Sequence, residues 1–251
     1  MLEPMLFMIG AVFLLAGFVK GVLGLGLPTV SMGLLAVTMQ PSRALAIVIA
    51  PAIITNIWQT FGGPYLRDIL KRLWPLMLCT VIGSLMSAGA MSGPHARYGT
   101  VALGALLVIY AVIGLTQFRL RIERRNEKWV GGIVGLVTGV ISASTGVQVI
   151  PSMPFIQAIG MEKDELVQAL AVFFTVATLA LSVSVSASGL LNATTAIPGA
   201  IALACSFAGM FVGQTVRAKM PTEAFRRWFL IGMILLGIYL AGSAIYELHA
   251  L

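Results

Sequence analysis

The sequence predicts an all-α polytopic membrane protein, and two observations lead to this class. Hydrophobic residues make up 59% of the 251 residues and charged residues only 10%, far below the roughly 25% that is typical of soluble domains. The mean hydropathy is +0.98, and so few charged side chains cannot cover the surface of a soluble protein of this size. A soluble enzyme and a disordered chain are both excluded.

Eight apolar segments lie between charged residues and turn signals. Six have the length of one transmembrane helix, about 20 residues: 43–61, 73–91, 98–118, 166–188, 196–216 and 228–246. The other two, 5–39 and 129–160, are too long for one helix and slightly short for two helices with a turn. Glycine and proline interrupt both near the middle, so we expect each to form a broken helical hairpin of two short arms.

The order of segment lengths repeats in the two halves, which predicts an internal duplication. A shift of 122 residues pairs Gly17 with Gly139 and Gly24 with Gly146. Each half then contains one broken hairpin followed by three transmembrane helices. The predicted division is a first repeat over 1–118, a basic cytoplasmic linker over 119–128 and a second repeat over 129–251.

The positions of lysine and arginine predict how the chain is oriented. If both hairpins return to their starting side, the loops on one side hold 13 Lys and Arg and the loops on the other side hold two, Arg43 and Arg97. If each long segment crosses once, the counts are 8 and 7. The positive-inside rule therefore favours the hairpins, with inverted repeats and both termini in the periplasm of a bacterial inner (plasma) membrane. Because the basic residues form short clusters between apolar segments, we do not expect binding to nucleic acid.

The two interruptions predict a binding site for a small anion. Irregular backbone inside a membrane must face protein or a water-filled cavity, and inverted repeats with broken helices are typical of transporters. Two helix N-termini that converge near mid-membrane would attract an anion, although close packing alone can also explain glycine and proline there. The candidate substrate-binding residues beside the breaks and on the following helices are Gly24, Gly26, Pro28, Thr29, Asn56, Gln59, Ser142, Ser144, Thr145, Gly146, Gln148, Thr175 and Thr178.

Lys20 is the one charged residue deep inside an apolar segment. A lysine at the centre of a bilayer costs at least about 2.5–3.5 kcal/mol, and this one lies one helical turn before Gly24. We expect it to face the substrate, the alternative being that it snorkels to an interface. None of the nine acidic residues lies inside an apolar segment, which argues against proton or sodium coupling through a membrane carboxylate. No motif for a cofactor, a metal or catalysis is present.

Several short motifs resemble the TauE/SafE sulfite exporter-like family. Its first repeat is similar to FVKGVLGLGLP over 18–28, the stretch 44–51 and NIWQ over 56–59. Its second repeat is similar to TGVQ over 145–148 and PFIQAIG over 154–160. The resemblance covers nearly the whole chain and implies transport, usually outward, of sulfur-containing anions such as sulfite, sulfoacetate or other organosulfonates.

The chain departs from the family pattern at Gln148, where the family tends to have a small residue, and this leaves the identity of the anion open. An alternative function is a membrane thiol–disulfide relay through Cys79 and Cys205, which lie in corresponding helices of the two halves. No charged neighbour activates either thiol, as such a relay requires. The expected partners are the anion and membrane lipid, and the sequence is also compatible with a homodimer.

Overall fold

The computed structural model describes residues 2–88, 96–116, 121–187, 196–217, 219 and 222–249. Over these residues the chain forms ten α-helices and no β-strand, so the predicted all-α class is confirmed. Helices of the first half are α1 (Leu2–Leu23), α2 (Leu27–Leu35), α3 (Pro41–Thr60), α4 (Leu66–Met86) and α5 (Ala96–Thr116). Helices of the second half are α6 (Glu127–Thr145), α7 (Ser152–Ala158), α8 (Lys163–Ala187), α9 (Ala196–Arg217) and α10 (Thr222–His249).

Eight of the described helices are long and apolar enough to cross a membrane, and the short helices α2 and α7 are not among them. The two hairpins therefore differ from the prediction of two short arms. Their first arms, α1 and α6, have 22 and 19 residues, while their second arms, α2 and α7, have nine and seven. The arms are unequal because the breaks at Gly24 and Gly146 come only after a full-length apolar helix has been completed.

Helix α4 begins earlier than the apolar segment 73–91 predicts. It starts at Leu66 and includes the charged stretch up to Arg72, so Pro75 lies inside the helix instead of at its beginning. Charged residues form the first turns here because a helix can continue beyond the apolar region of a membrane. An apolar segment therefore locates a span but not the end of its helix.

In both hairpins, the chain that follows the second arm comes back to the beginning of the first arm, or the second arm ends beside the segment that precedes the first. In the first hairpin, the Arg43 guanidinium lies 3.7 Å from Met5 Sδ, so the beginning of α3 is beside the beginning of α1. In the second, the backbone N–H of Ile122 donates to Ala158 O over 3.0 Å, so the end of α7 lies beside the segment that precedes α6. This proximity is compatible with hairpins that make no net crossing, which stays a prediction.

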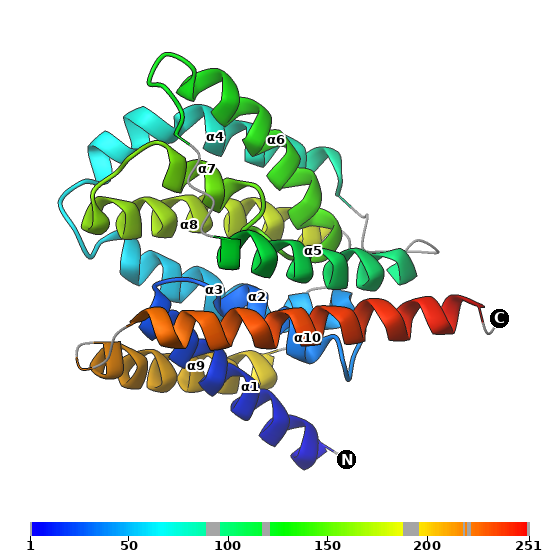
Figure 1. The fold of residues 1–251 in the computed structure, drawn as a ribbon. Helices are drawn as coiled ribbons and strands as arrows, with labels where there is room; N and C mark the ends of the chain where they lie inside the picture. The colour runs from blue at the N-terminus through cyan, green and yellow to red at the C-terminus, as the bar shows by residue number, and fades with distance from the viewer. Residues whose placement is uncertain are drawn as a thin grey trace.

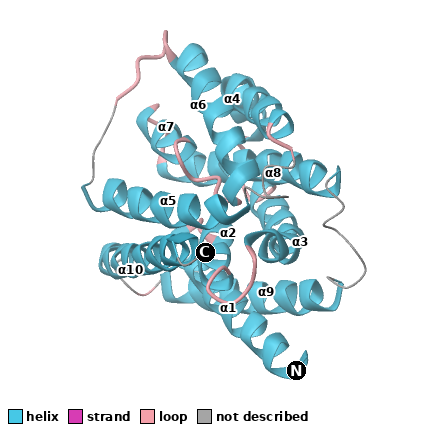
Figure 2. Cartoon of the chain, turned by 90° about the vertical axis from the view of Figure 1, so that its right-hand side faces the viewer, coloured by secondary structure: helices cyan, strands magenta, loops and turns pink. Residues whose placement is uncertain are grey.

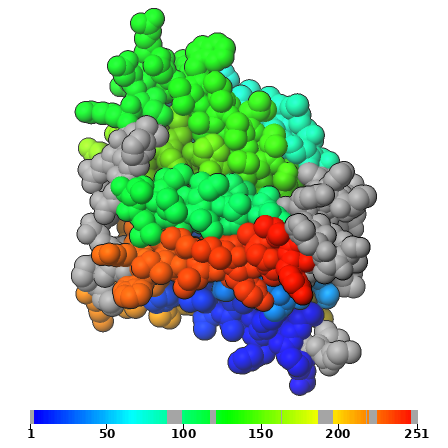
Figure 3. All heavy atoms as spheres, turned by 45° about the vertical axis from the view of Figure 1, so that its right-hand side comes forward, coloured from blue at the N-terminus to red at the C-terminus, as the bar shows by residue number. Residues whose placement is uncertain are grey.

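Helix pairs connect the two halves of the chain. Figures 1 and 2 show α4 with α6 on one side of the molecule and α1 with α9 on the opposite side, with α5 and α10 between them. Figure 3 shows α5 and α10 side by side along one face. Under the 122-residue shift, the α1–α9 pair corresponds to the α6–α4 pair, an exchange that a two-fold relation between the halves requires. The inverted orientation of the halves in a membrane stays a prediction.

Glycines bring the paired helices into backbone contact. A Cβ built on Gly17 or Gly209 would lie 2.2 Å from Ser206 O or 2.1 Å from Leu14 O across the α1–α9 contact. On the other side, a Cβ on Gly139 of α6 would lie 2.3 Å from Thr80 O of α4. Small residues that allow such close approach are the usual basis of helix association in membranes.

Replacing Gly139 with alanine is expected to destabilise the α4–α6 contact. The added methyl group would overlap Thr80 O and would also lie 2.6 Å from Ser84 N, and overpacking of this kind costs about 1–3 kcal/mol. The thermal midpoint of the detergent-purified variant should fall by several degrees. Gly232→Ala in α10 is the matched control because its added methyl group meets open space. Equal midpoints for the two variants would contradict this role of Gly139.

Candidate functional site

The first break separates α1 from α2 at a run of alternating glycine and leucine. Helix α1 ends at Leu23, Gly24 and Gly26 adopt φ values of 80° and 103°, and α2 begins at Leu27 with Pro28 in its first turn. Only glycine takes such left-handed angles without strain, and proline is well tolerated in a first turn. The sequence therefore predicted this break correctly.

The second break follows α6. Gly146 closes that helix with a φ of 74°, and its N–H donates to Ser142 O. Thr145 Oγ1 accepts the N–H of Val147 at 3.2 Å, which orients the chain as it leaves the helix. After the break, α7 has only seven residues, so its dipole is small compared with that of a long helix.

Lys20 lies in a buried polar contact one turn before the first break. Its side chain is 2% exposed, and Nζ donates a hydrogen bond to Asn56 Oδ1 of α3, itself 2% exposed. The amide nitrogen Nδ2 of Asn56 is buried without a hydrogen-bond partner. Within the described residues no carboxylate lies within ion-pair distance of Lys20. A buried ammonium and a buried amide donor therefore lie together without a compensating negative charge.

A second polar pair occupies the related position in the other half. Thr178, which corresponds to Asn56 under the 122-residue shift, has its hydroxyl 3.0 Å from Gln148 Oε1. Both side chains are 2% exposed. Thr60 lies one turn after Asn56 on α3, and Thr175 lies one turn before Thr178 on α8. The Oγ1 atoms of Thr60 and Thr175 are 3.0 Å apart. The polar residues thus gather along the contact of α3 with α8.

The two breaks do not converge on one shared site, contrary to the prediction from the sequence. The first break lies beside Lys20 and therefore near Asn56, four residues before the end of α3. The second lies beside Leu45, close to the beginning of α3, at 3.3 Å from a Cβ built on Gly146. The cause is the length of the first arms. Because α1 and α6 have the full length of a span, each break lies at the far end of its first arm instead of near the middle.

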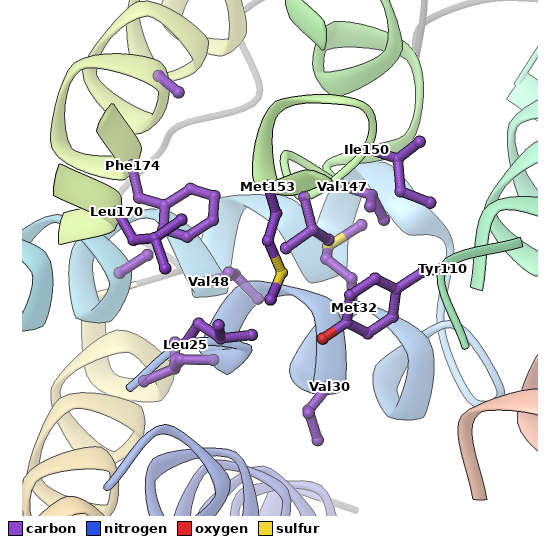
Figure 4. Close-up of a cluster of buried hydrophobic side chains, with 14 of the residues drawn as sticks. Leu25, Val30, Met32, Val48, Tyr110, Val147, Ile150, Met153, Leu170 and Phe174 are labelled. Carbon is purple, nitrogen blue, oxygen red and sulfur yellow. The ribbon is translucent and has the colours of Figure 1, made fainter. Parts of the chain in front are cut away.

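Apolar side chains fill the region between α2 and the second break. Figure 4 shows Met32 of α2 below Val147 and Met153, with Ile150 and Tyr110 beside them. The end of the Met32 side chain lies 2.9 Å from a Cβ built on Gly146. The second break therefore meets the second half of α2, not its N-terminus, in a packed apolar contact.

Several predicted donors are already used within their own helices. Ser142 donates to Gly139 O over 3.0 Å and Ser144 to Val140 O over 2.9 Å, while the Thr145 hydroxyl donates to Ile141 O over 2.8 Å. Thr29 is 3% exposed among apolar neighbours of α2. Gln59 is half-buried and lines a pocket beyond the end of α3. The side-chain hydrogen bonds between candidates thus join Lys20 with Asn56 and Gln148 with Thr178.

The sequence reasoning missed an ion pair that joins three helices. Arg72 of α4 binds Glu127 of α6 through two hydrogen bonds of 2.8 and 2.6 Å, and it also donates to Ile159 O, directly after α7, over 2.7 Å. Glu127 is 7% exposed. It is the first residue of α6, so one of the acidic residues lies buried at the end of a predicted span. Bidentate Arg–carboxylate pairs combine strength with a fixed geometry.

A buried amide that holds the α3–α4 turn was also missed. Gln168 of α8 donates to Thr60 O over 2.9 Å and to Gly63 O over 2.7 Å, and it accepts the N–H of Tyr65 at 2.9 Å. Both the amide nitrogen and the amide oxygen of Gln168 therefore have hydrogen-bond partners in the turn. No sequence signal links Gln168 to a turn that is more than 100 residues away. The one local sign is that a polar amide stands about one turn into a predicted span.

The structure does not bring the two cysteines together. Cys79 of α4 faces Gly132 of α6, and Cys205 of α9 faces Gly10 of α1, each 3.5 Å from a Cβ built on that glycine. Both are free, and their helix pairs lie on opposite sides of the molecule in Figures 1 and 2. Disulfide exchange needs Cα atoms within about 7 Å, so the thiol relay considered from the sequence is contradicted.

Eight apolar helices, two broken hairpins and a buried cation beside one break define a polytopic membrane transporter. A family model for the sulfite exporter TauE/SafE matches residues 9–240, and the chain belongs to this family. No curated protein and no solved structure matches the chain.

Proposed function

We propose that this protein exports small sulfur-containing anions, such as sulfite or organosulfonates, across the bacterial inner (plasma) membrane. Membership of the sulfite exporter family supports transport of this class. The observation that carries the proposal is the buried Lys20 ammonium, which has no carboxylate beside it among the residues that the structure describes. A buried charge is strongly unfavourable unless a partner compensates it, and a bound anion is the partner that this site lacks.

The anion is expected to accept hydrogen bonds from Lys20 and from Asn56. An ammonium group has three donors, of which one is used by Asn56 Oδ1. The unpartnered Nδ2 of Asn56 supplies a further donor at the same place. The oxygens of a sulfite or sulfonate group accept several such bonds at once. The N-terminus of α2, with nine residues behind it, adds a favourable partial charge on the other side of the break.

This model of the site replaces the two-sided site that the sequence predicted. The first break, with Gly24 and Gly26, is the binding side, because among the described residues the buried ammonium group lies beside this break. The second break supplies the counterpart, since its contact with Met32 of α2 is apolar and these two segments can separate while the Gln148–Thr178 hydrogen bond stays in place. We propose that opening of this contact exposes the anion to the far side of the membrane, as alternating access requires.

Both termini are expected to face the periplasm. This follows from the excess of basic residues in the loops that the hairpin arrangement places inside, 13 against two. A fusion of a reporter that is active only in the cytoplasm, placed after Leu251, should therefore be inactive, while a periplasmic reporter there should be active. A fusion in the basic linker at Arg125 should give the reverse result. Cytoplasmic activity after Leu251 would contradict the inverted arrangement.

Transport is expected to be electrogenic and to need no proton or sodium partner. The membrane potential contributes about 2.3 kcal/mol per charge per 100 mV, equivalent to roughly a 50-fold gradient of a monoanion. Purified protein in liposomes should move sulfite or sulfoacetate when a potassium-diffusion potential is imposed without a pH or sodium gradient. Flux that responds only to a pH gradient at zero potential would exclude this mechanism.

A further inference from the structure

A pocket of about 310 Å³ opens where four parts of the chain meet. It lies between the end of α3, the α3–α4 turn, the beginning of α8 and the end of α9. Figure 1 shows these four parts of the chain toward its left edge. Gln59, Tyr65, Val167 and Arg217 are among its lining residues. This volume is at the lower end of the range for small-molecule sites. In the predicted topology the pocket faces the cytoplasm.

Two of the lining side chains are free to bind a ligand. Within the described residues, neither the Arg217 guanidinium nor the Gln59 amide has a hydrogen-bond or ion-pair partner, although each is only partly exposed. Gln168, in contrast, is fully engaged with the α3–α4 turn and holds the rim of the pocket in place. Arginine and amide donors in a preformed pocket are well suited to the oxygens of an anionic group.

The pocket adjoins the buried lysine site. Val167, which lines the pocket, lies 3.7 Å from a Cβ built on Gly24 in the first break. Gln59 follows Asn56 by three residues on α3, so the two amides lie about one turn apart on one side of the helix. A ligand in the pocket is therefore separated from Lys20 by the break itself and by one turn of α3.

We propose that this pocket is a loading site, where a short organosulfonate binds before it reaches Lys20. The inference rests on the proposed export function and adds a second, outer binding site to it. Arg217 binds the sulfonate and Gln59 donates to it, while the carbon chain contacts Val167 and Tyr65. Asp164, an exposed carboxylate that also lines the pocket, weakens binding by repulsion, so that the ligand can leave for the inner site.

Protection of an introduced cysteine tests this loading site. Val167→Cys is placed in a chain whose own Cys79 and Cys205 are replaced by serine, and its modification by a charged thiol reagent is timed with and without sulfoacetate. Sulfoacetate should slow the modification. Arg217→Gln should raise the half-protecting concentration about tenfold, the loss expected for one hydrogen bond to a charged group. Asp164→Asn should lower it about two- to fivefold, as removal of a surface charge does.

Two further variants make the test specific. Arg227→Gln removes the same charge from an exposed residue outside the pocket and should leave protection unchanged. Lys20→Ala should stop flux but keep the protection, because the two sites are distinct. Protection that disappears with Lys20→Ala, or sulfoacetate flux in the Val167→Cys protein without any protection, would overturn the loading site. Absence of flux of both sulfite and sulfoacetate in the unmodified protein would instead contradict the export function itself.

Discussion

Replacement of Lys20 with alanine is expected to abolish transport and to weaken binding of sulfite or sulfoacetate at the inner site, beside Lys20, by about 30-fold or more. The loss of one partner from a buried charge pair costs about 2–5 kcal/mol, and each 1.4 kcal/mol is a factor of ten. Lys20 is the charged side chain at the first break, and Asn56 alone cannot supply a positive charge. Isothermal titration of the purified variant and flux into proteoliposomes measure the two effects.

Three variants separate the charge of Lys20 from its volume. Lys20→Arg keeps the charge and should retain part of the binding, because the guanidinium is larger than the ammonium it replaces in a site that is 2% exposed. Lys20→Met keeps the length without the charge and should behave like Lys20→Ala. Lys71→Ala removes an exposed charge from α4 and serves as the control. If Lys20→Ala transports the anion and binds it at the inner site as tightly as the unmodified protein, the lysine has no part in that site.

Replacement of Arg72 with alanine is expected to destabilise the protein by about 3 kcal/mol. Removal of one partner from a buried ion pair leaves the other charge uncompensated, at a cost of about 3–5 kcal/mol, and the lower end applies because the Arg72 side chain is 24% exposed. The variant also loses the bond to Ile159 O, which ties the end of the second hairpin to α4. Thermal unfolding in detergent measures the change.

A double-mutant cycle distinguishes the ion pair from simple loss of packing. Arg72→Ala combined with Glu127→Ala should be more stable than Arg72→Ala alone, because no unpaired carboxylate remains buried. Arg67→Ala, an exposed arginine on the same helix, should have little effect. Additive losses in the double variant would show that Arg72 and Glu127 act independently.

The membrane fold and its breaks could be predicted from the sequence because they depend on local features. Runs of apolar residues determine the spans, and the glycines at 24 and 146 end their helices with left-handed angles that other residues avoid. Lys20 could be identified for the same reason, because a single charged residue inside an apolar segment is visible in the local sequence without knowledge of its partner. Its hydrogen bond to Asn56 was not predictable, although both residues were candidates.

Contacts between distant residues were beyond the reach of the sequence. Arg72 and Glu127 are 55 residues apart, and each looked like an ordinary loop charge because α4 and α6 extend beyond their apolar segments. The position of the breaks at opposite ends of α3 depends on the full length of α1 and α6, which the total segment length does not reveal. The duplication was visible in the sequence, whereas the exchange of helices between the halves appears only in the packing.

That exchange has a consequence for how the protein is made. Helix α6 finds its partner α4 already in the membrane, whereas α1 packs against α9, which is synthesised last but one. About 170 residues separate the end of α1 from the beginning of α9, and at 5–20 residues per second this delay is roughly 10–35 s. During that time the face of α1 that carries Gly17 and Gly21 lacks the α9 backbone against which it packs in the complete protein. We therefore expect a period during synthesis in which the α9-binding face of the first helix is open to other membrane proteins, such as chaperones.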